Sequence, residues 1–360
     1  MENKKWFVIG LMSGTSLDGL DLVYVKIELN KGYHFEILET EAVNYSDIWK
    51  NRLKDAFGFS GEKLTFLDAQ YGKFLGQQVE DFIQKKSIEK IDFIASHGHT
   101  IFHDPGRGYT LQIGNGAQLS ATTKRKVICD FRTQDVALGG QGAPLVPIGD
   151  QLLFSHYDFC LNLGGFANIS YQKEISRIAY DICAVNIVLN HFTRLNGLEY
   201  DDGGKMASEG KVNKDLLHEL NSLGYYKEMA PKSLGYEFVI ETQLPLIEKY
   251  ELSLPDILAT CVEHSAVQIA EIVNQVVTEN EGAQYRMLIT GGGAYNTYLI
   301  ERIKDLCAVD VIIPSKEIIE FKEALIFALL GVLRNEGQVN CLKSVTGASH
   351  DHSGGQIYNY

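Results

Sequence analysis

Ser13, Gly14, Thr15, Ser16 and Asp18 stand together between two apolar runs near the start of the chain. Small residues let backbone N–H groups approach an anion, and hydroxyl groups add further donors. A carboxylate beside bound phosphates can hold Mg²⁺, directly or through water. The stretch therefore predicts a phosphate-binding turn with Asp18 as a metal ligand, although an ordinary polar hairpin turn has the same composition. The lysine-containing P-loop motif does not occur.

Two further glycine turns also follow apolar runs. Gly164 and Gly165 lie between the runs 159–163 and 166–171, which read as a second hairpin that loosely repeats the first. The triplet 291–293 follows the apolar run 287–290, where it suits close approach by a nucleotide. Each turn alone is a weak signal. Together, the three turns indicate two lobes that close on a nucleotide, with one hairpin from each lobe contacting its phosphates.

Asp181 is the best candidate for a general base. It follows the apolar residues 178–180 and precedes a second apolar stretch, so its carboxylate stands at the start of a buried segment. A carboxylate in that environment can accept a proton from a reacting group. The alternative, a helix N-cap, has equal support from composition.

Three other side chains could contact a ligand. Arg132 follows an apolar run and offers a guanidinium fork for a carboxylate or phosphate; a surface ion pair with Asp130 or Asp135 is the alternative. His97 could bind a ligand or form a structural hydrogen bond. A metal cluster of His97 with two neighbouring histidines, at 99 and 103, is disfavoured because no carboxylate or cysteine completes it. Glu323 is either a cleft-facing residue or a solvated one.

Hydrophobic periodicity places these residues on an α/β framework. A strand that ends in a polar turn is typical of an open α/β sheet, where ligands bind at the carboxyl ends of the strands. In the first predicted helix the apolar positions are Phe66, Ala69, Phe74, Val79 and Phe82. The expected elements are strands at 6–11, 20–29, 91–96 and 126–131, hairpin strands at 159–163 and 166–171, a strand at 287–290, and helices at 61–86, 256–279 and 320–333.

Composition excludes several functions. The 360 residues are 45% hydrophobic and 22% charged, with a net charge of −13, which disfavours nucleic acid and anionic membrane surfaces as partners. No apolar run approaches the ~20 residues needed to cross a bilayer. The six cysteines form no CxxC pair, so buried reduced thiols in a cytoplasmic protein are expected. His350 and His352 near the end are expected to be solvated.

The motifs resemble, in order and over nearly the whole chain, those of the anhydro-N-acetylmuramic acid kinases of the sugar kinase/Hsp70/actin superfamily. The most specific are GLMSGTSLDG at 10–19 and GGQGAPLVP at 139–147. The others lie at 96–101, 112–114, 130–132, 162–169, 200–201 with Gly204 and Ala207, 231–233, Gly235 with 237–238, 291–293 with Asn296, 323–324 and 345–348.

The resemblance implies a two-lobed, ribonuclease H-like α/β fold with the active site in the interlobe cleft. The N-terminal lobe would comprise residues 1–148, completed by about 334–360, and the C-terminal lobe residues 149–333. The implied activity opens 1,6-anhydro-N-acetylmuramic acid by hydrolysis and phosphorylates its O6 with ATP and Mg²⁺, as in cell-wall recycling. A homodimer is expected by resemblance only.

The resemblance also implies residue roles. Asp181 is the catalytic base, Asp18 organises the metal, and the sugar is contacted by the side chains of His97, Thr100, Arg132 and Glu323. ATP is bound by Ser13, Gly14, Thr15, Ser16, Leu17, Asp18, Gly19, Leu20, Gly164, Gly165, Asn168, Gly291, Gly292, Gly293 and Asn296.

Two departures keep other functions open. The family usually follows its catalytic aspartate with Thr-Gly-Pro-Gly-Asn, whereas residues 182–186 here read ICAVN, and the family's arginine in the Pro-Lys-Ser motif is Tyr236. These changes put nucleotide or sugar contacts in doubt. The alternatives are an ATPase or phosphatase of the same superfamily and a non-catalytic regulator that binds nucleotide or sugar.

Overall fold

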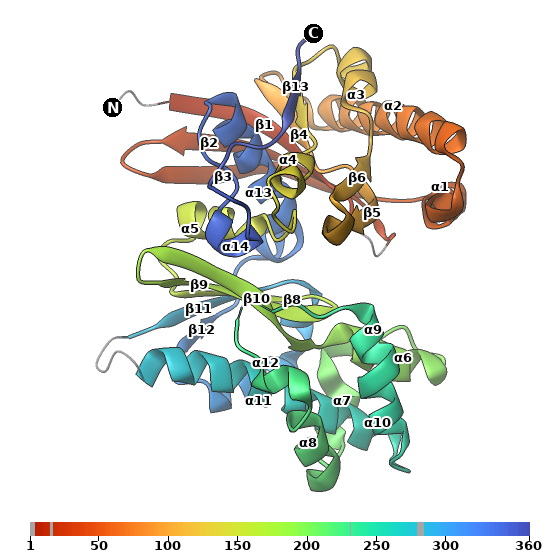
Figure 1. Cartoon of the computed structure of the whole chain (residues 1–360), viewed down its shortest axis with the longest axis vertical. Coiled ribbons are helices and arrows are strands. Elements are labelled where there is room, and N and C mark those ends of the chain that lie inside the picture. Colours follow the sequence, from red (N-terminus) through yellow and green to blue (C-terminus); the bar gives the residue numbers. More distant parts are fainter. Residues whose placement is uncertain (1–3, 15–16, 231, 279–283) are drawn as a thin grey trace. The chain divides into compact units, whose positions relative to one another are not determined.

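A computed structural model describes residues 4–14, 17–230, 232–278 and 284–360. These residues divide into two compact units (Figure 1). Unit 1 runs to Leu153 and is completed by Phe321–Tyr360, and unit 2 is Phe154–Glu320. Each unit is described by itself.

Unit 1 is built on a six-stranded sheet in the order β13-β7-β4-β1-β2-β3. β1, β2 and β3 are antiparallel to one another, whereas β4 is parallel to β1 and β7 is parallel to β4. Its elements are β1 (Lys4–Met12), β2 (Gly19–Leu29), β3 (Tyr33–Asn44), α1 (Asp47–Asp55), α2 (Gly61–Lys86), β4 (Phe93–Ser96), β5 (His99–Asp104), β6 (Tyr109–Ile113), α3 (Gly116–Thr123), β7 (Val127–Cys129), α4 (Thr133–Ala137), α5 (Val146–Leu153), most of α13 (Lys316–Asn335), α14 (Lys343–Thr346) and β13 (Gln356–Tyr358).

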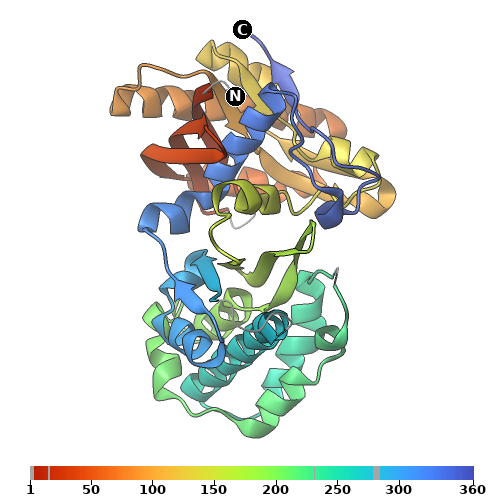
Figure 2. The ribbon, with the colours of Figure 1, turned by 90° about the vertical axis from the view of Figure 1, so that its left-hand side faces the viewer.

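Unit 2 has a five-stranded sheet in the order β10-β9-β8-β11-β12. Figure 2 shows its helices gathered against one face of this sheet. Its elements are β8 (Phe159–Leu163), β9 (Phe166–Lys173), β10 (Ser176–Ala184), α6 (Asn186–Leu195), α7 (Lys205–Glu209), α8 (Lys214–Asn221), α9 (Tyr236–Phe238), α10 (Leu244–Glu248), α11 (Leu254–Thr278), β11 (Arg286–Thr290), α12 (Thr297–Leu306) and β12 (Asp310–Ile312).

The two sheets share one topology. In unit 2, β8, β9 and β10 are antiparallel, β11 is parallel to β8 and β12 is parallel to β11. This matches β1, β2, β3, β4 and β7 of unit 1, strand for strand. The order 3-2-1-4-5 with these directions is that of the ribonuclease H-like fold, so the predicted fold class is confirmed. The weak sequence echo between the two glycine hairpins is therefore a structural repeat.

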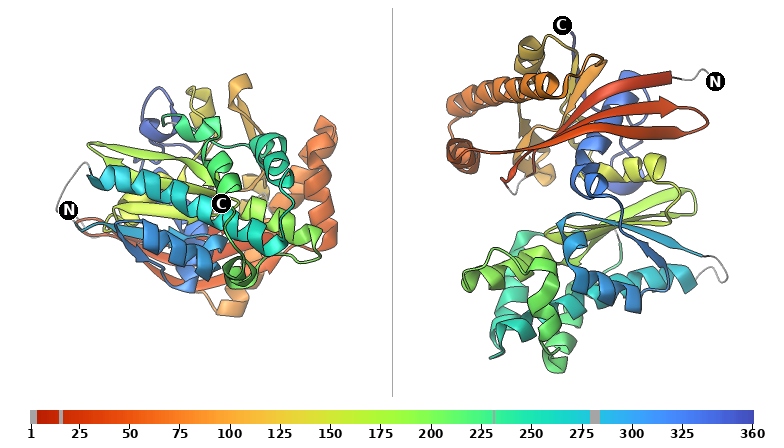
Figure 3. Two further views of the ribbon diagram at one scale, coloured as in Figure 1. Left: turned by 90° about the horizontal axis from the view of Figure 1, so that it is seen from below. Right: turned by 180° about the vertical axis from the view of Figure 1, so that it is seen from behind.

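Helices α2 and α13 pack against opposite faces of β1, as Figure 3 shows. Ile9 and Leu11 belong to the core under α2, whereas the intervening Gly10 faces α13 because side chains alternate along a strand. The sequence-based division returned the chain to the first lobe near residue 334. In the structure the chain rejoins unit 1 at Phe321, because α13 packs against the sheet of unit 1 from that residue on.

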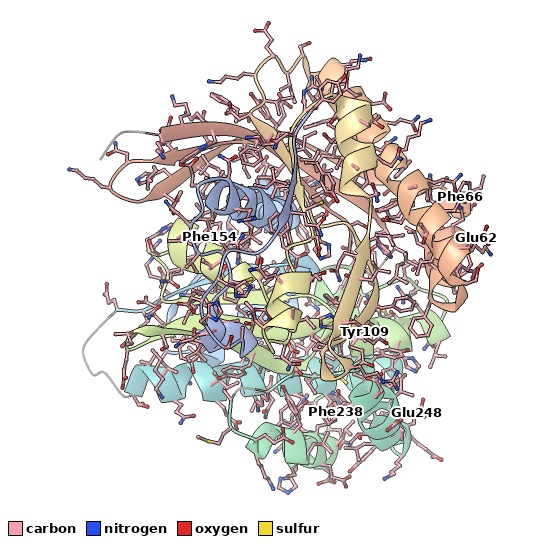
Figure 4. The ribbon with its side chains drawn as sticks, turned by 45° about the horizontal axis from the view of Figure 1, so that its top comes forward. Glu62, Phe66, Tyr109, Phe154, Phe238 and Glu248 are labelled. Carbon is pink, nitrogen blue, oxygen red and sulfur yellow. The ribbon has the colours of Figure 1, made fainter. Side chains whose placement is uncertain are left out.

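The helix predicted at 61–86 forms as α2, and its predicted positions Val79 and Phe82 are buried, whereas Phe66 is not. Phe66 is 61% exposed, and Figure 4 shows Phe66 and Glu62 on the outer side of the helix. In this first part of the helix the buried positions are instead Leu64, Leu67 and Tyr71, which follow the 3.6-residue period.

Two expectations about side chains have opposite outcomes. All six cysteines are free and buried, as predicted. His352 is only 6% exposed and not solvated, because residues 340–355 return across unit 1 and pair Cys341 with His352. Among the helices of the described residues, none has the length and apolarity to cross a membrane.

Gly10→Ala is expected to destabilise the chain. A Cβ at Gly10 would lie 2.2 Å from the carbonyl oxygen of Ala324, so α13 would have to move away from β1. Overpacking of this kind costs ~1–3 kcal/mol. The urea midpoint should fall, whereas Gly32→Ala, which adds a Cβ with no atom within 4 Å, should leave it in place. Equal midpoints for the two variants would contradict this packing.

Candidate active site

The first glycine turn joins β1 to β2, and Ser13 in it is buried. Its Oγ lies 2.7 Å from the hydroxyl of Tyr45 and 2.9 Å from Nδ1 of His99, and Tyr45 in turn contacts the hydroxyl of Tyr71 at 2.5 Å. The Ser13 hydroxyl therefore faces this internal network, so its backbone N–H is the better donor to a phosphate. Thr15 and Ser16 lie outside the described residues.

The second half of the turn leaves one carboxylate in solvent. Asp18 is exposed, while its carbonyl accepts a hydrogen bond of 3.3 Å from the backbone N–H of Tyr45. Gly19 is required by close packing, since a Cβ there would lie 2.4 Å from a carbonyl oxygen of β3. Leu17 and Leu20 pack on the core, so only their backbones can meet a ligand. An exposed carboxylate on a fixed backbone fits the hard oxygen ligand that Mg²⁺ prefers.

His97 and Arg132 form a directly bonded pair in unit 1. The ring of His97 donates from Nδ1 to the carbonyl of Gly98 at 2.9 Å and accepts at Nε2 from Nε of Arg132 at 3.0 Å. Arg132 also donates to the carbonyl of Gly142 at 2.7 Å. Burial, and then the charge of Arg132, hold the pKa of His97 well below its usual value, so the ring is neutral and can accept this bond.

Asp135 fixes the glycine-rich segment beside this pair, a role that sequence reasoning missed. Its buried carboxylate accepts a hydrogen bond of 2.7 Å from the backbone N–H of Gly142 and another of 2.7 Å from the hydroxyl of Thr346. A Cβ at Gly140 would lie 2.2 Å from Asp135 Oδ2. The signal was the nearness of an acidic residue to a run of glycines, of which Gly140 is needed where the backbone passes the buried carboxylate.

The other predicted sugar contacts are placed differently. Glu323 lies on α13, and desolvation raises its pKa, an effect that the nearby charge of Arg132 partly offsets. Thr100 lies on β5, in a separate two-stranded sheet with β6, and accepts a hydrogen bond of 3.3 Å from Gln112. His103 bonds to Thr110 at 3.0 Å. Within the described residues, the three predicted histidines do not belong to a group whose possible metal-ligand atoms lie close together.

In unit 2, four polar residues form a row across the sheet. Asp181 of β10 lies opposite Asn168 of β9, Asn168 lies opposite Asn162 of β8, and Asn162 lies beside Thr290 of β11. Residues in register on neighbouring strands point to the same face. The row therefore presents a carboxylate, two amides and a hydroxyl on one face, close to the glycine turns 164–165 and 291–293.

Asp181 is held by two hydrogen bonds. Its Oδ2 accepts from the backbone N–H of Leu234 at 3.0 Å, and its own carbonyl accepts from the hydroxyl of Tyr225 at 2.5 Å. Burial raises the pKa of Asp181, and the Leu234 bond partly offsets this. Asp181 lies inside β10, whereas α6 begins at Asn186, so the N-cap alternative is wrong.

The unusual stretch 182–185 lies in the core of unit 2. The side chains of Ile182, Cys183, Ala184 and Val185 are at most 2% exposed. The backbone N–H of Val185 donates to the carbonyl of Gly165 at 2.8 Å, so the start of α6 is bonded to the β8–β9 turn. The departure from the family pattern therefore changes core side chains, while Asp181 stays on the sheet.

The three glycines 291–293 have different reasons to be glycine. Gly291 has φ +82°, and a Cβ there would lie 2.6 Å from Asn162 Oδ1; a Cβ at Gly293 would lie 2.6 Å from Cβ of Leu163. At Gly292 the nearest such atom is 4.0 Å away. Only Gly292 therefore leaves open space for a ligand. Asn296 caps α12 by accepting from the N–H of Leu299 at 3.0 Å.

The repeated ribonuclease H-like unit with glycine hairpin turns is the architecture of the sugar kinase/Hsp70/actin class. The model of the anhydro-N-acetylmuramic acid kinase family matches residues 6–360, and the chain belongs to this family. The family resemblance and the predicted enzyme class, a kinase that uses ATP, are confirmed.

Curated relatives extend over the same length. The anhydro-N-acetylmuramic acid kinase of Sulfurimonas denitrificans is 33% identical over 374 residues, covering 98% of this chain and 99% of the relative. The anhydro-N-acetylmuramic acid kinase of Photobacterium profundum is 35% identical over 375 residues, covering 97% of this chain and 98% of the relative. Among solved structures, a ROK family glucokinase from Streptomyces griseus has a TM-score of 0.41 at 9% identity, covering 90% and 98%, a likeness too low to bear on function.

Gly292→Ala and Gly293→Ala should separate ligand contact from packing. Gly292→Ala should keep the urea midpoint and raise the KM for ATP by ~10-fold or more, because the added methyl group enters open space that we expect the nucleotide to use. Gly293→Ala should instead lose ~1–3 kcal/mol of stability.

Gly224→Ala is the control for both the urea midpoint and the KM for ATP, because a Cβ at this position of unit 2 would have no atom within 4 Å. An unchanged KM for ATP in Gly292→Ala would contradict a nucleotide contact at this position.

Proposed function

We propose that the chain converts 1,6-anhydro-N-acetylmuramic acid, water and ATP into N-acetylmuramic acid 6-phosphate and ADP, a step of cell-wall recycling. Membership of the family supports the reaction class. The observation that carries the catalytic assignment is Asp181, a half-buried carboxylate fixed by Leu234 and Tyr225 at the end of a polar row.

Asp181 is the general base of this proposal. Its carboxylate removes a proton from a water molecule, which attacks the anomeric carbon and breaks the bond to the bridging oxygen. The freed 6-oxygen then attacks the γ-phosphate of ATP. A carboxylate with a raised pKa is a stronger base than a solvated one, and a positioned base supplies ~10²–10⁴ in rate.

The sugar contacts are proposed for unit 1. Arg132 offers a guanidinium to the substrate's carboxylate, and the neutral His97 that is bonded to it fixes its direction. Glu323 shares the electrostatic environment of Arg132 and is exposed, which suits a hydroxyl group of the sugar. Thr100 is the least supported contact because it lies on the separate β5–β6 sheet.

For ATP, we propose contacts through the two hairpin turns and the third glycine turn. Backbone groups at Ser13, Gly14, Leu17, Gly19 and Leu20 would donate to phosphates, with Thr15 and Ser16 as predicted partners. A Cβ at Gly164 or Gly165 would make only ordinary contacts, at 3.4 and 3.7 Å, and Gly292 is open, while Gly291, Gly293 and Asn296 shape the third turn. Asn168 is exposed in the polar row. Asp18 would hold Mg²⁺, which neutralises phosphate charge when bound.

Two further points are part of the same proposal. A homodimer follows from the family resemblance and is tested by light scattering on the purified chain. A cytoplasmic location is proposed because the reaction uses ATP.

Asp181→Asn is expected to lower turnover by at least ~10²-fold while ATP still binds, because the amide keeps an oxygen for Leu234 but cannot take a proton. The assay supplies anhydro-sugar and ATP and measures the 6-phosphate product. Asp215→Asn, at an exposed position of α8, is the matched control. Near-normal turnover in Asp181→Asn would reject Asp181 as the base.

Running the wild-type reaction in ¹⁸O water distinguishes the alternatives. Label at the anomeric oxygen of the product is expected for hydrolytic opening of the bridge. Label in inorganic phosphate, without sugar phosphate, would indicate the ATPase or phosphatase function. Binding of both ligands with no product would indicate the regulator.

The pH profile should carry the signature of Asp181. The base acts only when deprotonated, so kcat/KM should fall as the pH is lowered through the pKa of Asp181, which burial raises above its usual value. The acidic limb therefore lies at a higher pH than for a solvated aspartate. A wild-type profile that stays flat down to the usual aspartate pKa would contradict the assignment.

A further inference from the structure

Asp135, Cys341 and His352 place three metal-binding atom types together in unit 1. One ligand atom of each lies within 4.8 Å of the other two, and the residues are 0%, 2% and 6% exposed. They come from three parts of the chain: α4, the segment before α14, and the tail before β13. This cluster is separate from Asp18, and the proposed reaction uses none of its side chains.

The ring of His352 presents an unused lone pair to this cluster. Its Nδ1 lies 3.3 Å from the carbonyl oxygen of His350, an acceptor, so Nδ1 carries the hydrogen. In the neutral ring Nε2 is then an acceptor, and it is buried without a hydrogen-bond partner in the described residues. Metal-binding histidines typically have this arrangement, with one ring nitrogen donating to a carbonyl and the other free for the ion.

The lone pair on Nε2 of His352 faces the carboxylate of Asp135, and without a cation between them this arrangement is unfavourable. Nε2 of His352 lies 3.6 Å from Oδ1 of Asp135, which is longer than an ordinary hydrogen bond of about 3.2 Å or less. Two acceptors that face each other in a buried site repel, and buried charges are normally paired or bound to a metal. A cation held by both atoms removes the repulsion.

Cys341 supplies the third donor in a fixed position. Its N–H donates to the carbonyl of His352 at 3.1 Å, and the N–H of His352 donates to the carbonyl of Cys341 at 3.2 Å. This reciprocal bridge places the two side chains next to each other. Burial and the nearby Asp135 raise the pKa of the thiol to about 12, so it is protonated while no cation is bound.

We propose that Asp135, Cys341 and His352 bind a divalent metal ion of the zinc class. Sulfur, nitrogen and carboxylate oxygen together suit Zn²⁺ or Co²⁺, whereas Mg²⁺ and Ca²⁺ prefer oxygen alone. Binding replaces the thiol proton, which leaves to solvent, and leaves the fourth tetrahedral position for water.

Such an ion would have a structural role. It would link the tail to Asp135, whose carboxylate also receives the bonds from Gly142 and Thr346. Gly142 in turn accepts a hydrogen bond from Arg132. The ion would therefore hold the C-terminal segment against the glycine-rich segment that positions Arg132.

The test is Co²⁺ binding to the full chain after chelator treatment. The wild type should bind one equivalent with a thiolate-to-cobalt charge-transfer band, and Zn²⁺ should displace it. Cys341→Ser should lose the band and at least ~100-fold in affinity. The control is Cys307→Ser, which removes a buried free thiol from unit 2 and should bind Co²⁺ as the wild type does.

Two results would overturn the proposal. One is a wild type that binds no stoichiometric Co²⁺ or Zn²⁺; a protonated His352 ring by NMR would then assign the contact to an ion pair with Asp135. The other is an equal band in the wild type and in His352→Gln. Metal binding by the wild type and NMR of its His352 ring can be measured even where a variant fails to fold. Neither measurement depends on kinase activity.

Discussion

The buried carboxylate of Asp135 is the contact on which the proposed sugar-binding part of unit 1 depends. A fully buried charge is costly unless donors surround it, and here Gly142 and Thr346 supply two. Gly140 follows from this requirement, because a Cβ there would lie 2.2 Å from Asp135 Oδ2, whereas Gly142 is needed for its φ of +68° and its packing against Val136. Once Gly142 is fixed, its carbonyl directs Arg132, and Arg132 in turn selects the neutral ring of His97. The motif at 139–147, one of the two most specific in the sequence, is thus a support for the proposed sugar contacts beside it.

In unit 2 the corresponding constraint is strand register. Hydrogen bonding of β8, β9, β10 and β11 aligns Asp181 with Asn168, Asn162 and Thr290, although these residues are spread over more than a hundred positions of the chain. A slip of one residue in any strand would turn its polar side chain to the other face. The bulge between Asp181 and Cys183 absorbs one residue, and the chain then enters α6 while Asp181 keeps its place in the row.

Local periodicity and turn chemistry were sufficient to predict the long helices and the two glycine hairpins, whereas the ribonuclease H-like fold class was predicted from the family resemblance of the motifs. Sequence reasoning misplaced the buried face only in the first part of α2, since Phe66 was given more weight there than Leu64 and Leu67. It also took His352 as solvated and considered Asp135 only as a surface ion-pair partner of Arg132, because the positions of both residues depend on the return of the tail across unit 1. The distinct roles of Gly291, Gly292 and Gly293 were likewise hidden, since the atoms that crowd two of them come from β8 and the turn after it.

The departure after Asp181 shows how such distant packing can preserve a site while the motif changes. A valine in place of a glycine would be disruptive if residue 185 lined a ligand pocket. Instead Val185 is 1% exposed in the core of unit 2, with its N–H bonded to the carbonyl of Gly165. The polar groups that fix Asp181 come from Leu234 and Tyr225, far along the chain. The base of the proposed reaction is therefore positioned by segments other than the one that changed, so the altered motif is compatible with kinase chemistry.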